Sequence, residues 1–96
     1  MNFQELINVF IEGAQEGVAG SAKRPGNLKI EGNQLIHYNT PILERYDNKF
    51  ILNITRYSLQ TGQVQKKVKA TIPEENLIYV KSVEKGPQTT LRSFIL

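Results

Sequence analysis

The chain has no cysteine, no tryptophan and a single histidine, His37. Without cysteine there are no disulfides and no thiolate chemistry, so 96 residues must fold on packing alone. The lone histidine and the scattered carboxylates form no pair at metal-ligand spacing, which argues against hydrolytic and metal chemistry. We therefore expect a protein that is not an enzyme and has no cofactor, with His37 as a structural residue of an apolar strand.

Long apolar runs are also missing, since no stretch approaches the roughly 18 residues that span a membrane. The first ten residues, MNFQELINVF, carry an acid rather than a base, so we expect no signal peptide. The glycines of GAQEGVAG (13–20) follow no predicted strand and do not form a nucleotide-binding loop. These absences predict one soluble domain over 1–96 that stays in the cytoplasm.

Charge is unevenly distributed along the chain. Residues 1–20 hold Glu5, Glu12 and Glu16 and no base, whereas the remainder holds all twelve Lys and Arg residues. The net charge of +3 is therefore the sum of an acidic end and a basic remainder. This separation favours an oriented approach to a charged partner, with the three glutamates as an acidic partner-facing surface. A solvated surface of mixed charge is the alternative.

Two helices are predicted from apolar residues at helical spacing. The first covers 3–18, with Asn2 and Glu5 forming a capping box at its start. The second covers 59–71 and is ended by Pro73.

Strands are predicted where β-rich apolar runs alternate with turn signals. Pro41 should break or bulge the second of them, because proline cannot donate to a strand ladder. Leu28 and Ile30, like Phe50, Leu52 and Ile54, should face the core. The predicted strands are 27–31, 34–45, 49–55 and 76–83. The order α-β-β-β-α-β predicts an α+β fold, with a mainly antiparallel four-stranded sheet and both helices on one face.

The junction before the second helix is the strongest candidate site. Ser58 or Thr61 can cap the helix, whose N-terminal N–H groups and dipole attract anions. Arg56 stands just before this point, and Lys66 and Lys67 follow one to two turns later. Two interpretations stay open: an anion site, or a helix cap beside which Tyr57 only packs.

Nucleic-acid binding is a further hypothesis. Basic residues in a predicted loop and on the second helix could contact phosphates: Lys23, Arg24, Lys66, Lys67 and Lys69. Four tyrosines offer stacking faces: Tyr38, Tyr46, Tyr57 and Tyr79. Against it, the net charge is modest and no recognition motif is present.

The C-terminal segment LRSFIL is apolar, and its large side chains are costly to leave in water: Leu91, Phe94, Ile95 and Leu96. They should cover the sheet, or form an edge through which a second copy pairs into a homodimer.

One resemblance rests on residues 26–65. This part of the chain resembles a module of small uncharacterised phage and plasmid proteins. The module consists of a short Y-x-T-x-I, an Asn in a strand, and then Y-S and a threonine that open a helix. Its residues here are Tyr38, Thr40, Ile42, Asn53, Tyr57, Ser58 and Thr61. The resemblance implies a mobile-element protein that binds host machinery, for example an anti-CRISPR-like inhibitor of a host defence nucleoprotein acting by protein–protein contact. Direct nucleic-acid binding through the basic helix and loop is the alternative.

Overall fold

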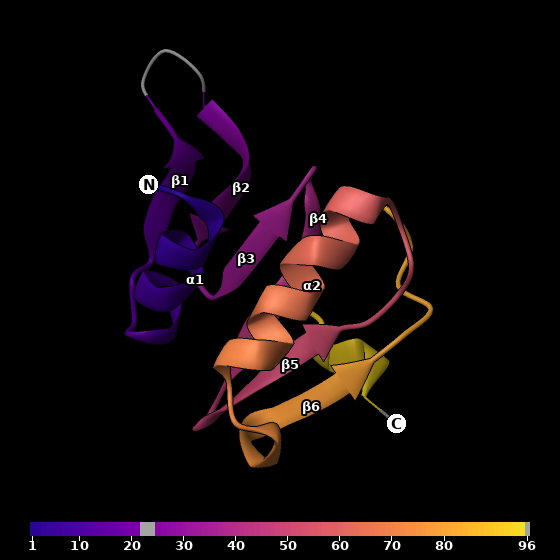
Figure 1. Ribbon diagram of the computed structural model, residues 1–96. Helices are drawn as coiled ribbons and strands as arrows, with labels where there is room; N and C mark the ends of the chain where they lie inside the picture. The colour runs from indigo at the N-terminus through magenta and orange to yellow at the C-terminus, as the bar shows by residue number, and fades with distance from the viewer. Residues whose placement is uncertain (22–24, 96) are drawn as a thin grey trace.

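Two helices lie on one face of a six-stranded sheet in the computed structural model, which describes residues 1–21 and 25–95 (Figure 1). The elements are α1 (Phe3–Ile11), β1 (Glu16–Gly20), β2 (Pro25–Glu31), β3 (Gln34–His37), β4 (Thr40–Tyr46), β5 (Lys49–Asn53), α2 (Leu59–Thr71), η1 (Glu74–Asn76), β6 (Leu77–Val80) and η2 (Arg92–Phe94). The strands lie in chain order. Neighbours from β1 to β5 are antiparallel, and β6 joins β5 in parallel after the α2 crossover. The α+β class is confirmed, whereas the predicted count of four strands is wrong.

The first helix is shorter than predicted, because residues 12–18 leave it. Gly13 has a φ of +114°, a backbone conformation that glycine adopts readily. The Arg45 guanidinium donates to the Phe10 carbonyl oxygen at 2.6 Å, to that of Gly32 at 2.9 Å and to that of Ala14. A cation on these carbonyls stabilises the end of α1. The chain then turns back and pairs with β2 as the edge strand β1.

The predicted strand 34–45 is two strands, β3 and β4, joined by a tight turn at Tyr38 and Asn39. Both turn residues have positive φ, +50° and +65°, as a two-residue hairpin of the primed type requires. Pro41 lies inside β4 opposite Ile36, where the register shifts. The bulge predicted at Pro41 is confirmed, but the chain reverses before it.

The main core lies between the sheet and the two helices. Leu6, Ile7 and Phe10 of α1 share it with Val64 and Val68 of α2, so the prediction that both helices cover one face is confirmed. Of the strand residues predicted to face the core, all but Ile54 do so: Leu28, Ile30, Phe50 and Leu52. Ile54 is 43% exposed because β5 ends at Asn53, and its expected core position is wrong.

The second helix matches its predicted bounds. Ser58 caps it by accepting a hydrogen bond from the Thr61 N–H at 3.2 Å. Within the described chain, neither helix is long and apolar enough to cross a membrane.

The C-terminal segment covers the other face of the sheet, behind the strands in Figure 1. Leu91 is fully buried in a second cluster with Ile51, Val80 and Val83, and Phe94 and Ile95 pack against it. The prediction that the tail covers the sheet is confirmed for these residues, while Leu96 lies outside the described residues.

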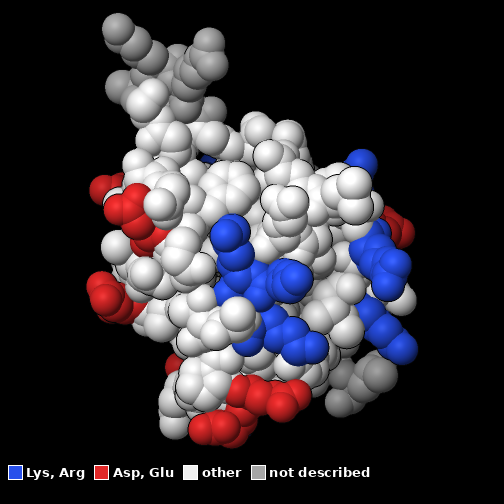
Figure 2. Space-filling view, viewed as in Figure 1, with Lys and Arg blue, Asp and Glu red and all other residues white. Residues whose placement is uncertain are grey.

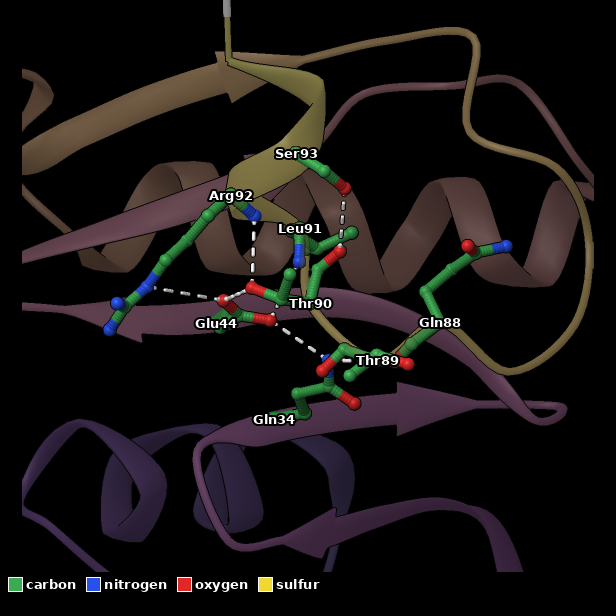
Figure 3. Close-up of polar contacts among 8 residues, drawn as sticks. All are labelled: Gln34, Glu44, Gln88, Thr89, Thr90, Leu91, Arg92 and Ser93. Atoms are coloured by element: carbon green, nitrogen blue, oxygen red, sulfur yellow. Dashed lines mark hydrogen bonds and ion pairs between the residues drawn. The ribbon is translucent and has the colours of Figure 1, made fainter.

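Glu44 fixes this tail to the sheet (Figure 3). The residue is 4% exposed, and its carboxylate accepts hydrogen bonds from Thr90 Oγ1 at 2.6 Å, Leu91 N at 2.8 Å and Gln34 Nε2 at 2.8 Å. Arg92 Nε lies 3.9 Å from the same carboxylate. A buried carboxylate with three donors is fully paired, so Glu44 joins β3, β4 and the tail.

Candidate functional site

The predicted junction residues lie together at the start of α2. A groove of about 580 Å³ is lined by Arg56, Tyr57, Ser58 and Lys66, four of the residues proposed from the sequence. The groove also contains Leu59 and Ile54. Leu59 is 92% exposed, so the first residue of α2 presents a large apolar side chain to solvent.

The other predicted basic residues of α2 lie outside this groove. Lys67 lines a separate hollow beside Met1 and Phe3, and the Lys69 ammonium lies 5.5 Å from the centre of the Tyr79 ring. Lys23 and Arg24 lie outside the described residues. Adjacent positions on a helix point in different directions, which explains why Lys66 and Lys67 reach different hollows.

Acidic and basic side chains are only partly separated on the surface, since Figure 2 also shows acidic groups below the basic ones and beside them. In Figure 2 the basic groups gather over α2, and acidic groups lie along the side formed by α1 and β1. Glu5, Glu12 and Glu16 are all exposed. Glu5 accepts a hydrogen bond from the Asn2 N–H at 2.9 Å in the predicted capping box, so this member of the acidic set also stabilises α1.

Thr61 points away from the groove into the protein. It is 3% exposed, and its Oγ1 lies 2.7 Å from His37 Nδ1. The Ser58 hydroxyl donates to the same oxygen at 3.1 Å. These contacts form a Ser58–Thr61–His37 chain that joins the start of α2 to β3.

A second network fixes the connector between β5 and α2. The Tyr57 hydroxyl donates to the Val83 carbonyl oxygen at 2.6 Å and accepts from Asn53 Nδ2 at 3.0 Å. Gln65 Nε2 donates to the carbonyl oxygens of Asn53 and Thr55, both at 2.8 Å. Tyr57 is therefore an anchor of the connector as well as a wall of the groove.

A cavity of about 450 Å³ lies on the β3–β4 side of this junction. It is lined by His37, Tyr38, Thr40, Tyr57, Ser58, Gln60, Thr61 and Lys85. Five residues of the phage-like pattern therefore meet at one cavity, and a sixth, Asn53, is hydrogen-bonded to its wall. His37 and Lys85 were not among the candidate site residues, because the spacing of the sequence gives no sign that residues 37 and 85 share a cavity with α2.

Burial lowers the pKa of His37 below its ordinary value of 6.5. The unfolded chain then takes up a proton at a higher pH than the folded chain does. We expect the free energy of unfolding to fall as the pH is lowered from about 7.5 to about 5.5, and to level off once folded His37 is also protonated. Urea unfolding across this range measures the effect, and His37→Gln should flatten it. A stability that rises as the pH falls would contradict this.

Two of the four tyrosines proposed to stack on bases, Tyr46 and Tyr79, have a cation of the same chain over their rings. The Arg92 guanidinium lies 4.8 Å from the Tyr46 ring centre, as Lys69 covers Tyr79. Among the described residues, no group of three or more histidine, aspartate or glutamate side chains is placed to hold a metal ion.

Comparison with known proteins gives no relative: no family model, no curated protein and no solved structure matches this chain.

Proposed function

We propose that the protein is a non-enzymatic binding protein of a phage or plasmid that inhibits a host defence nucleoprotein by protein–protein contact. Its recognition surface is the groove at the start of α2, defined by Ile54, Arg56, Leu59 and Lys66. The sequence resemblance supports the mobile-element origin.

The exposed Leu59 carries this proposal. A leucine that is 92% exposed at the first position of a helix contributes almost no core packing. Beside it, Ile54 is 43% exposed, and Arg56 and Lys66 supply positive charge to the same groove. Protein interfaces combine buried apolar anchors with arginine in this way. The groove thus fits a protein surface with an apolar residue surrounded by acidic side chains.

Affinity capture from a bacterial lysate tests the proposal. The immobilised protein should retain a specific host protein, and the retention should survive nuclease treatment because the contact is between proteins. Failure to retain any specific protein would count against the proposal. A capture that nuclease abolishes would favour the second candidate.

Direct nucleic-acid binding is that second candidate, and the exposure of Lys66, Lys67 and Lys69 on one helix favours it. If each lysine contacts one phosphate of a DNA duplex, log affinity should fall against log salt with a slope of about −3. Replacing the three lysines by glutamate should abolish binding. Replacing Lys29, Lys49 and Lys81 instead makes the same change in net charge and should weaken binding much less. A wild-type protein that shifts neither DNA nor RNA at low salt would exclude this function.

A further inference from the structure

The cavity between the β3–β4 hairpin and the start of α2 is built by side chains that hold the two elements against each other. Tyr38 lies in the hairpin turn with a φ of +50°, an uncommon conformation for an aromatic residue. Its hydroxyl donates to Gln60 Oε1 at 2.6 Å, directly from the turn to the first turn of α2. The loop carrying Lys85 is held to the hairpin by the Gly86 N–H, which donates to Thr40 Oγ1 at 2.9 Å.

The cavity offers hydrogen-bond donors and a cation but no carboxylate. None of its lining residues is Asp or Glu, and the Lys85 ammonium makes no hydrogen bond or ion pair with another described residue. The backbone N–H group of Gln60, a cavity residue at the start of α2, likewise has no partner within the described chain. These groups favour a negatively charged ligand, which the dipole of a thirteen-residue helix also attracts.

His37 adds an independent sign of a missing partner. It lines the cavity, it is 1% exposed, and its Nε2 has no hydrogen-bond partner among the described residues. The Thr61 hydroxyl oxygen has two lone pairs, so besides accepting from Ser58 it can either donate to His37 Nδ1 or accept from it. The imidazole proton is on Nε2 in the first case and on Nδ1 in the second. Buried polar groups in folded proteins are normally paired, so the unpaired Nε2 distinguishes His37 from the other residues that line the cavity.

We propose that this cavity binds a small organic anion, a carboxylate or phosphate monoester with a planar apolar body. The anionic group would lie at Lys85 and the α2 N-terminus, and the body between the Tyr38 and Tyr57 rings. A volume of about 450 Å³ is within the range of small-molecule sites. The cavity shares Tyr57 and Ser58 with the groove, but His37, Tyr38 and Lys85 line the cavity and not the groove, so variants of these residues test the two sites separately.

Phenyl phosphate is a suitable probe, titrated into the ¹⁵N-labelled full chain and followed by ¹H–¹⁵N correlation spectra. We expect saturable shifts confined to the amides of 37–40, 57–61 and 84–86, and a change in the ¹⁵N shift of His37 Nε2. Lys85→Met should weaken binding about tenfold or more, while Lys69→Met, a matched loss of an exposed lysine on the far end of α2, should change it less than about twofold.

Other outcomes would overturn the proposal. Equal shifts with inorganic phosphate would mean an adventitious ion only, and equal shifts with uncharged benzyl alcohol would mean an apolar crevice without anion recognition. Absence of cavity shifts at about 10 mM probe, or equal weakening by Lys85→Met and Lys69→Met, would show that the cavity is not a ligand site.

Discussion

A chain ending at Thr90 should be less stable than the full protein by about 3–5 kcal/mol. The truncation removes the fully buried Leu91 and the half-buried Phe94 and Ile95, and it exposes Ile51, Val80 and Val83. It also deprives Glu44 of the Leu91 N–H and of Arg92. For a domain of this size, the melting temperature should fall by more than about 10 °C, and thermal and urea unfolding measure both quantities.

Two single substitutions separate the contributions within the tail. Leu91→Ala should account for about 2–4 kcal/mol of the loss, because it leaves a cavity in the second cluster. Ser93→Ala, at an exposed residue of η2, should change stability by less than about 0.5 kcal/mol. A truncated protein that melts like the full chain would contradict the packing described here. If the tail also joins two copies, the melting temperature of the full chain should rise with protein concentration.

Replacing Arg45 by methionine should destabilise the protein by about 2–4 kcal/mol, since hydrogen bonds to a charged group are worth more than neutral ones. The substitution removes the guanidinium donor from the carbonyl oxygens of Phe10, Ala14 and Gly32. It also removes the guanidinium that stacks 4.1 Å from the Phe10 ring centre. Urea unfolding should show the loss, and amide exchange should increase around residues 10–16.

Arg45→Lys is the informative control for this position. Lysine keeps the charge but cannot donate to three carbonyls in a fixed fork, so its stability should fall between those of the wild type and Arg45→Met. Equal stability of all three proteins would show that the end of α1 is determined by Gly13 alone.

The parts of the fold predicted correctly are those specified by neighbouring residues. The second helix has a serine cap, a narrow apolar stripe and a proline just past its end, and its bounds are as predicted. The end of α1 was not predictable in this way, because it depends on Arg45, which is 31 residues away from Ala14. The β3–β4 turn was missed because its Tyr-Asn sequence lacks the glycine that usually marks a primed turn.

The candidate site shows the same difference between residues that are close in the sequence and residues that are far apart in it. Arg56, Tyr57, Ser58 and Lys66 are close in sequence, and the structure places them in one groove as the sequence suggested. The cavity, in contrast, combines three distant segments, and only the folded sheet brings His37 and Lys85 to the start of α2. Thr61, proposed as a helix cap or a binding residue of the junction, is buried, and its hydroxyl bonds His37.

The central claim is that the groove at the start of α2 is the recognition surface. Affinity capture of the host protein from a bacterial lysate with the Leu59→Asp variant tests it most directly. Leu59 is so exposed that its replacement should not lower the melting temperature, and aspartate suits the first turn of a helix. Val18→Asp is the matched control, since Val18 is 50% exposed on β1, at the opposite edge of the sheet from β6. We expect Leu59→Asp to melt like the wild type and to lose the host protein that Val18→Asp still retains. Retention of the same protein by folded Leu59→Asp would contradict the account.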